Sequence, residues 1–517
     1  VGETKGTTHI LHWSVRGGDA TKGNQRLGCA QAVESISLAM ALLAELMGGA
    51  AHTATVARLG EALWDPLADH VAANWLHPYV PSKPADVEVF RQQAALAGSL
   101  EEAARRLGLT AGTVLSRAAA AIELQYAQER RRLTVGAARD AMLLPLHDVV
   151  NVSQAAEALS NEASERCTAN AMPQASTATV EALGAADEVG GLEESHRGVV
   201  MRQPRCQVSR AAHEVAGLGV RALEEAVYTG GCVAAQLVFA VMETCDLYRA
   251  LIPVQHLQTL QAAPQLRMIL RNDLHYLALE LLRLQLVFGK TLEAELRAPV
   301  PLAGLAPGLA ASARAEEAAA LAMQEAAILE VLDGAGGLEG LADEERLGNA
   351  HKAVQQALHS VRCAASAWRN MLPEDARRHN LICLMQCIGR RLLSDVLSLE
   401  DIEEEETVHL QQLLHAALET DALAEDEPGA ATAGEEAEAT GGEHPGDLSA
   451  EVLQAVPCWL QLQELARMLD TPMKEITQRW VEGLLPGLGF EAQQVQHLIC
   501  AVFAPSSLRV DCLAQIV

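Results

Sequence analysis

Residues 264–290 read PQLRMILRNDLHYLALELLRLQLVFGK, and the spacing of their apolar side chains decides the fold class. Large apolar residues recur at steps of three and four, namely Leu274, Leu277, Leu281, Leu284 and Phe288. Charged residues fall together on another face, namely Asp273, Glu280, Arg283 and Lys290. This is the pattern of an amphipathic helix that packs through one face. It ends a long helical block that we expect over residues 209–290.

The composition favours helices along the rest of the chain as well. Hydrophobic residues make up 50% of the 517 residues, but aromatic residues only 3%. The apolar residues are mostly Ala and Leu, which favour helices, whereas strands favour aromatic and β-branched residues. An all-β domain is therefore nearly excluded, and a doubly wound α/β fold is disfavoured. We expect further helices over residues 31–48, 86–106, 111–131, 313–332, 351–399 with a break near Pro373, 456–469, 473–482 and 491–503.

Breaks in this pattern suggest how the chain is organised. Prolines interrupt it after residue 77 and at Pro299, Pro301 and Pro307. Thr471 and Pro472 resemble a helix N-cap followed by a proline at the first helical position. We predict an all-α fold, an elongated rod of stacked helical bundles. The predicted N-terminal part consists of a disordered segment over 1–30, a middle helical region over 31–160 and a flexible linker over 161–203. Helical bundles follow over 204–400, with loops near 298–312 and 333–342. The chain then continues with an acidic segment over 401–450, mostly disordered after 420, and a closing helical bundle over 451–517.

The charge of the chain is concentrated in that acidic segment. The chain carries 39 Lys and Arg against 67 Asp and Glu, a formal net charge of −28. Residues 401–450 contain 15 acidic and no basic residues, which is more than half of that excess. This balance argues against nucleic-acid and anionic-lipid surfaces, which need clustered cations. We interpret Asp401 to Asp447 as a solvated, disordered loop; binding to a basic patch on a coat protein or another partner is the alternative.

The ends and the cysteines indicate a cytoplasmic protein. The chain begins at Val1 without Met or a signal peptide, which is typical of a fragment that lacks its true N-terminus. No run of about 18 apolar residues is present to cross a membrane. The 11 cysteines are an odd number without regular spacing, so we expect reduced thiols.

Several residues were weighed as chemical sites. Gly289-Lys290-Thr291 resembles the end of a phosphate-binding loop, but Leu284 stands where that loop needs its first glycine, so we interpret Lys290 as a cation at a helix end. His9, His12 and Cys29 form an incomplete zinc set in an expected loop.

Two further sets have equally plain structural explanations. Cys383 and Cys387 lie one helical turn apart without a second pair of matching spacing, so we interpret them as small core residues. For His275 and Tyr276, beside Asp273, packing or an interhelical hydrogen bond is favoured over acid–base catalysis. We therefore predict no catalytic, cofactor-binding or metal-binding residues. A hydrolase or metal enzyme hidden among the helices is the remaining alternative. The six tryptophans are core residues or partner-binding anchors, namely Trp13, Trp64, Trp75, Trp368, Trp459 and Trp480.

Several stretches, in order along the chain, resemble one known family. The closing stretch is the most specific, with Val456-Pro457-Cys458-Trp459, Trp480, Phe490 and residues 498–503 (LICAVF). Other stretches are Ala138-Arg139-Asp140 with Leu146-His147-Asp148, Pro204 to Ser209, Ile252-Pro253-Val254, Pro264-Gln265-Leu266, Asn272 to Ala278 and Leu399 to Ile402; residues 64–90 agree more loosely. Together they resemble the middle and C-terminal regions of the Zeste-White-ten family of centromere/kinetochore and vesicle-tethering proteins. The chain departs from the family pattern at Leu274, at Leu279-Glu280 and at Leu462, and it lacks a stretch like the family's N-terminal coiled coil.

This resemblance implies an exocyst-type tethering-subunit architecture and a function without catalysis. It implies a scaffold subunit of a Dsl-type complex at the endoplasmic reticulum (ER), acting in Golgi-to-ER retrograde vesicle transport. The implied partners are a RINT/Tip-type subunit, a neuroblastoma-amplified/Sec-type or Rough Deal-type α-solenoid subunit, Zwilch, ER SNAREs and coatomer. The implied location is cytoplasmic, at the ER membrane through partners. The alternative is a kinetochore subunit of the Rough Deal/Zwilch-type complex in the mitotic spindle checkpoint, which can be a second role of the same protein.

Overall fold

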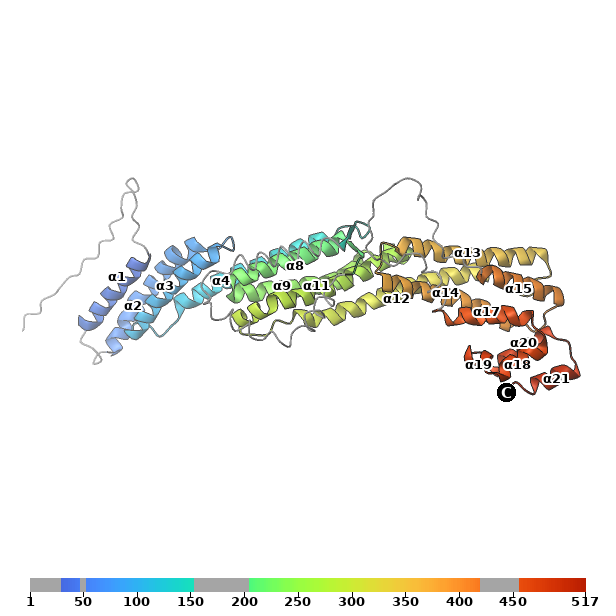
Figure 1. The fold of residues 1–517 in the computed structure, drawn as a ribbon. Coiled ribbons are helices and arrows are strands. Elements are labelled where there is room, and N and C mark those ends of the chain that lie inside the picture. The colour runs from blue at the N-terminus through green and yellow to red at the C-terminus, as the bar shows by residue number, and fades with distance from the viewer. Residues whose placement is uncertain (1–28, 47–52, 153–203, 419–454) are drawn as a thin grey trace, which may run out of the picture. The chain divides into compact units, whose positions relative to one another are not determined.

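Helices make up almost all regular structure in the computed structural model, which describes residues 29–46, 53–152, 204–418 and 455–517 (Figure 1). The strands within these ranges are β1 (Val149–Asn151) and β2 (Gln207–Ser209), which pair antiparallel. The predicted all-α class is therefore confirmed. Among the described residues, no helix combines the length and apolarity that a membrane crossing requires. The predicted N-terminal segment, the linker and most of the acidic segment fall outside the described residues.

The chain packs as two units. The first comprises Val1–Leu133 with Glu224–Leu237, and the second comprises Thr134–Leu223 with Val238–Val517. Three helices contribute residues to both units: α4 (Val114–Met142), α8 (Arg210–Thr229) and α9 (Gly231–Gln255).

The core of the first unit lies among its first four helices. These are α1 (Cys29–Leu46), α2 (Thr53–Val71), α3 (Asp86–Arg106) and the start of α4. Trp64, Phe90, Leu100 and Leu115 are buried in this core. The sequence analysis did not identify α2, which contains Pro66 and is followed by a π-helical turn (Ala72–Leu76) and a 3₁₀ turn (His77–Tyr79). The predicted break after residue 77 and the predicted helix over 86–106 are confirmed.

Two charged side chains, one buried and one partly exposed, fix two helix ends in the first unit. The fully buried Glu101 carboxylate of α3 accepts hydrogen bonds from the Leu115 and Ser116 backbone amides (2.8 and 3.1 Å), so it caps the start of α4. Arg91 donates to the Thr229 and Gly230 carbonyls at the end of α8 and pairs with Glu123 of α4 at 2.6 Å. These contacts satisfy backbone groups that a helix end leaves without partners.

The second unit begins around the long helix α11 (Pro264–Leu296). The predicted stripe on α11 is fully internal, since Leu274, Leu277, Leu281, Leu284 and Phe288 are each at most 2% exposed. The helix α11 packs against α8 and α9. Along the chain it is preceded by the short helix α10 (Leu257–Ala262) and followed by the 3₁₀ turn η4 (Leu302–Leu305) and α12 (Ala306–Asp333). α11 and α12 pack against each other along their lengths.

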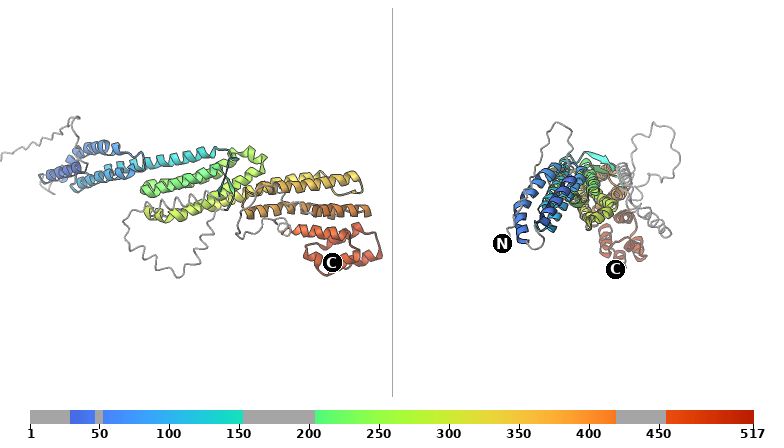
Figure 2. Two further views of the ribbon diagram at one scale, coloured as in Figure 1. Left: turned by 45° about the horizontal axis from the view of Figure 1, so that its top comes forward. Right: turned by 90° about the vertical axis from the view of Figure 1, so that its left-hand side faces the viewer.

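The second unit continues with α13 (Glu344–Trp368), α14 (Glu374–Leu397), α15 (Glu404–Leu418) and the closing helices. The closing helices are α17 (Pro457–Leu469), α18 (Met473–Val481), α19 (Leu484–Gly487), α20 (Ala492–Val502) and α21 (Ser507–Leu513). Figure 1 and the left view of Figure 2 place α17 beside α14 and α15, in agreement with their contacts. The core contains one face of α17, with Trp459, Leu462, Ala466 and Leu469.

Three expectations about boundaries need correction. The loop expected over 298–312 is shorter, because α12 begins at Ala306 and accommodates Pro307 in its first turn, where a missing N–H costs nothing. The N-cap of α18 is Pro472 and not Thr471, whose hydroxyl instead donates to the Arg467 carbonyl of the preceding helix at 2.7 Å. Two short helices, α19 and α21, were not expected. The expected breaks near 333–342 and Pro373 are confirmed.

The acidic segment is not a loop from its first residue. Its residues 404–418 form α15, whose Leu410, Leu413 and Leu414 are at most 1% exposed and belong to the core. Three glutamates occupy the first turn of α15, where the helix dipole favours negative charge. The interpretation of Asp401 onwards as a loop is therefore wrong for residues 404–418.

Candidate functional site

At the outer edge of β2, the family-like stretches 204–209 and 272–278 meet. β1 covers one edge of β2, with Val149 opposite Ser209 and Asn151 opposite Gln207. In an antiparallel pair, alternate residues direct their backbone groups away from the partner strand. The Gln207 and Ser209 amides accordingly donate away from β1, to the Met371 carbonyl (3.0 Å) and to Asp273 Oδ1 (2.6 Å).

Asp273 is the fully buried centre of one half of this site. Besides the Ser209 amide, its carboxylate accepts the Tyr248 hydroxyl at 2.7 Å. The Ser209 and Tyr248 hydroxyls lie 3.1 Å apart, and Ser209 Oγ accepts the Ala212 amide at the start of α8. Burial raises the pKa of the Asp273 carboxyl to about 6 and that of Tyr248 well above its usual range. The cluster joins α8, α9, α11 and β2.

Asn272 organises the other half of the site. Its Nδ2 donates to the Gln207 carbonyl at 2.9 Å and to the Met371 carbonyl at 2.7 Å. Met371 lies in the turn between α13 and α14, so one side chain connects three segments that are remote in the sequence. Asn272 belongs to a family-like stretch, but helical spacing alone gave no signal for this role. Adjacent helix positions point about 100° apart, so a polar pair can also share a solvent-facing side.

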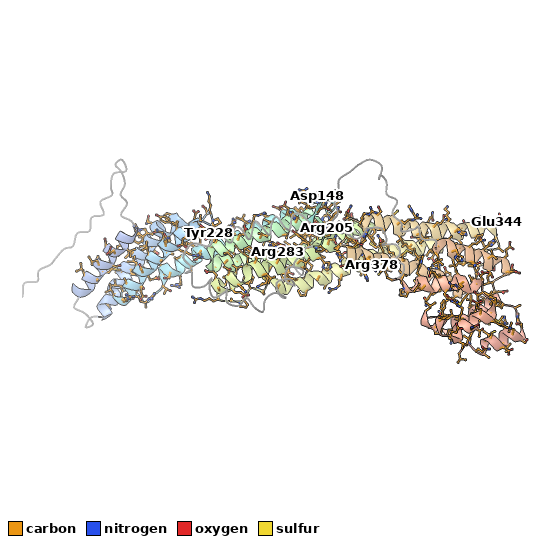
Figure 3. The ribbon with its side chains drawn as sticks, in the orientation of Figure 1. Asp148, Arg205, Tyr228, Arg283, Glu344 and Arg378 are labelled. Atoms are coloured by element: carbon orange, nitrogen blue, oxygen red, sulfur yellow. The ribbon has the colours of Figure 1, made fainter. Side chains whose placement is uncertain are left out.

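A salt bridge borders the site at the start of β1. Asp148, labelled in Figure 3, pairs with Arg210 at 2.7 Å, and its carbonyl accepts the Arg210 amide at 2.7 Å. Ala138 and Leu146, which precede Asp148 in the sequence, are also buried. The structure thus joins the stretches 146–148, 204–209 and 272–273.

Tyr276 contacts a neighbouring helix, and His275 beside it in the sequence is partly buried. The Tyr276 hydroxyl is 3.5 Å from His213 Nδ1 of α8, and the two rings stack with centroids 6.5 Å apart. This confirms the expected interhelical contact for Tyr276. Burial lowers the pKa of His275 to about 4, so its imidazole is neutral at physiological pH.

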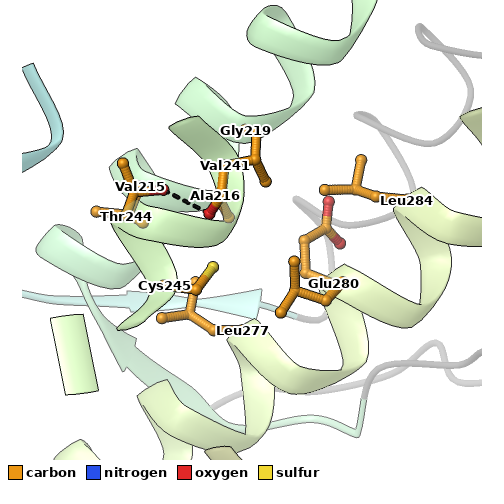
Figure 4. Close-up of a pocket in the computed structure, with 10 residues that line it drawn as sticks. Val215, Ala216, Gly219, Val241, Thr244, Cys245, Leu277, Glu280 and Leu284 are labelled. Atoms are coloured by element: carbon orange, nitrogen blue, oxygen red, sulfur yellow. Dashed lines mark hydrogen bonds between the residues drawn. The ribbon is translucent and has the colours of Figure 1, made fainter. Parts of the chain in front are cut away.

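A small pocket lies between α8, α9 and α11 (Figure 4). Its volume is about 10 Å³, which is room for roughly one water molecule. Its lining is mostly apolar, with Glu280 and Thr244 as polar members. Both Glu280 oxygens accept hydrogen bonds from Arg283 three residues along α11, so this carboxylate is already paired. The charged face predicted for α11 is therefore partly internal, because Asp273 and Glu280 are buried.

The weighed metal and phosphate ligands do not assemble into a site among the described residues. Cys383 and Cys387 lie on α14, and burial raises the pKa of both thiols. In the described ranges no three His, Cys, Asp or Glu side chains are close enough to hold a metal ion. His9 and His12 lie outside these ranges. Gly289-Lys290-Thr291 is in the interior of α11, so the placement of Lys290 at a helix end is wrong.

The described tryptophans are mainly core residues. Trp64, Trp368 and Trp459 are at most 3% exposed, while Trp75 and Trp480 are half-buried and pack at the edges of the two cores. Trp13 lies outside the described residues. Core packing is confirmed for the three buried indoles, which leaves Trp75 and Trp480 as candidates for partner contacts.

Comparisons with known proteins agree with this arrangement. The family model described as "ZW10 C-terminal helical domain" matches residues 352–516, and "Centromere/kinetochore protein zw10, C-terminal" matches residues 201–330. The chain is 25% identical over 463 residues to the centromere/kinetochore protein zw10 homolog of Rattus norvegicus, covering 89% of this chain and 58% of that protein. The Mus musculus homolog is 26% identical over 474 residues, which cover 89% of this chain and 58% of that protein. The Arabidopsis thaliana homolog is 25% identical over 312 residues, which cover 60% of this chain and 40% of that protein.

The chain therefore spans no more than 58% of the length of these curated relatives. The two family models together cover more than half of the chain, and each matches a region that contributes to the site at β2. The chain belongs to the Zeste-White-ten (ZW10) family.

Proposed function

We propose that the chain is a non-enzymatic scaffold subunit of a multisubunit tethering complex at the ER, acting in Golgi-to-ER retrograde vesicle transport. The observation that carries the proposal is that family-matched residues 201–330 and 352–516 form a helical core whose buried polar groups bind one another. Such groups hold helices in place and leave surface side chains to recognise partners. The protein then acts by presenting docking surfaces at defined positions, and it reaches membranes through its partners.

The closing helices offer a surface for the α-solenoid partner that the family resemblance implies. Val481, Leu484 and Val510 are 65%, 47% and 67% exposed, and Trp480 beside them is half-buried. Apolar side chains next to an aromatic anchor are typical of the centre of a protein interface. We expect affinity to come from their burial.

Affinity purification tests this proposal. The endogenous full-length protein, tagged and purified from interphase cells, is expected to bring down RINT/Tip-type and α-solenoid tether subunits together with ER SNAREs. With a double variant, Val481→Glu and Val510→Glu, the recovered amount of the α-solenoid subunit is expected to fall at least tenfold. Val408→Glu is the matched control, because Val408 is 48% exposed on α15. Recovery of none of these subunits with the wild-type protein would refute the tether proposal.

A kinetochore function is the second candidate. It is favoured by the names of the similar proteins, which are centromere/kinetochore proteins in rat, mouse and Drosophila melanogaster. The partners would then be Zwilch and a Rough Deal-type α-solenoid subunit in the spindle checkpoint. Imaging a fluorescent fusion through mitosis tests this role, with signal at unattached kinetochores expected. A fusion that stays away from kinetochores while restoring growth to depleted cells would exclude it.

A further inference from the structure

We propose that Asn272 and Asp273 act as a side-chain substitute for a third strand beside β2, in which Asn272 latches the region of residues 201–330 to the turn between α13 and α14. The proposal concerns a conformational device in the fold and is independent of the tether function. Its predicted consequence is that β2 and this turn open together when Asn272 is lost, while the packing of α8, α9 and α11 persists.

The need for a latch follows from the edge of β2 that no strand covers. A strand edge presents N–H and C=O groups that must find partners when buried. Val208 and Ser209 have no exposed surface, and Cys206 is only 7% exposed, so water has little access to form hydrogen bonds with this edge. α11 supplies an amide and a carboxylate at consecutive positions, which match the alternating groups of the strand.

The orientation of the Asn272 amide is fixed by its surroundings. Both hydrogens of Nδ2 point at carbonyl oxygens, those of Gln207 and Met371, and carbonyls only accept hydrogen bonds. The Oδ1 atom accepts from Arg271 Nη1 at 3.1 Å. Asn272 is 1% exposed, so solvent cannot easily replace these contacts.

The Met371 carbonyl is available because α13 has already ended. The helix stops at Trp368, and the amides of Met371 and Leu372 turn back to the Trp368 carbonyl at 3.2 and 3.0 Å. Carbonyls beyond a helix end need outside partners. Met371 receives two, the Gln207 amide and Asn272 Nδ2, and these bonds join the two regions that the family models match separately.

Site-resolved thiol labelling tests the latch in the full chain. Cys206 is the residue before Gln207 and is 7% exposed, whereas Cys245 on α9 is 4% exposed and lines the small pocket between α8, α9 and α11. Asn272→Ala leaves the partly buried Gln207 carbonyl without its side-chain donor, which is expected to raise the maleimide labelling rate of Cys206 by about tenfold to a hundredfold. Peptide mapping by mass spectrometry reads each cysteine separately, and the rate at Cys245 is expected to stay unchanged.

Two further variants keep the test decisive. Asn380→Ala is the matched control, because Asn380 is also fully buried but donates to Glu317 of α12, and it is expected to leave Cys206 at its wild-type rate. Asn272→Ser keeps one small donor and is expected to give an intermediate rate, which covers the case in which Asn272→Ala does not fold by circular dichroism. Unchanged labelling of Cys206, or equal increases at Cys206 and Cys245, would overturn the proposal.

Discussion

At the scale of single residues, Asp273 is a buried carboxylate held by hydroxyl and amide donors. Its donors are the Ser209 amide and the Tyr248 hydroxyl, and burial raises the pKa of its carboxyl from 3.8 to about 6. Between these values the folded state binds more protons than the unfolded state, so the free energy of unfolding falls as the pH rises through this window. The stabilisation from protonated Asp273 is thus present at acid pH and lost above about pH 6.

Asp273→Asn removes this titration and gives the first prediction. Between pH 4.5 and pH 7.5 the wild-type free energy of unfolding is expected to fall, relative to Asp273→Asn, by roughly 2 kcal/mol. Urea unfolding of both proteins at the two pH values measures the difference, and other titrating groups cancel in the comparison. A constant difference across this range would show that Asp273 does not titrate there.

The sequence could place Asp273 on a helix but could not predict its burial. The apolar stripe of α11 needs only local spacing, and it was correct at all five positions. Ser209 and Tyr248 lie 64 and 25 residues away, so their approach to Asp273 depends on tertiary packing. The same holds for Asn272, whose partner Met371 is 99 residues away.

Glu101 supports a second prediction at this scale. It is fully buried and caps α4, whereas the side chain of its neighbour Glu102 is 42% exposed and pairs with Arg105 along α3. Glu101→Ala is expected to destabilise the first unit by about 1–3 kcal/mol, because it leaves buried amides without an acceptor. Glu102→Ala is expected to change stability by less than about 0.5 kcal/mol. Equal effects in thermal unfolding would contradict the cap.

At the scale of elements, α15 shows how packing overrides composition. The sequence analysis weighed its acidic character and missed the Leu410, Leu413, Leu414 and Ala417 stripe, which follows helical spacing and is buried. The charge lies at the helix start, where it is compatible with the dipole. Proline was similarly read as a break at Pro307, although the first turn of a helix tolerates it.

Core truncation in α15 gives the third prediction. Leu413 has no exposed surface, so Leu413→Ala is expected to destabilise the second unit by about 2–5 kcal/mol through lost burial and a cavity. Val408→Ala on the exposed side of the same helix is expected to cost less than about 0.5 kcal/mol. Chemical unfolding followed by tryptophan fluorescence measures both, since Trp459 belongs to the same core. Near-equal losses would place α15 outside that core.

At the scale of the whole molecule, about a third of the net charge of −28 falls in residues 421–447. Residues 421–447 carry nine acidic and no basic residues. Before this stretch α15 ends at Leu418, and after it α17 begins at Pro457. These two helices pack directly against each other. Deleting 421–447 is therefore expected to leave the melting temperature and coatomer binding unchanged. A lost coatomer interaction would favour the alternative that this stretch binds a basic patch.

The proposed function at the ER is tested most directly by cargo retrieval in living cells. Cells are depleted of the endogenous protein and complemented with the full-length wild-type or the Val481→Glu, Val510→Glu variant, and secretion of an ER-resident protein bearing a retrieval signal is measured. Depletion is expected to cause its secretion, the wild-type to restore retention, and the variant to fail while Val408→Glu succeeds. Full retention of the ER resident after complete depletion would contradict a role in Golgi-to-ER transport.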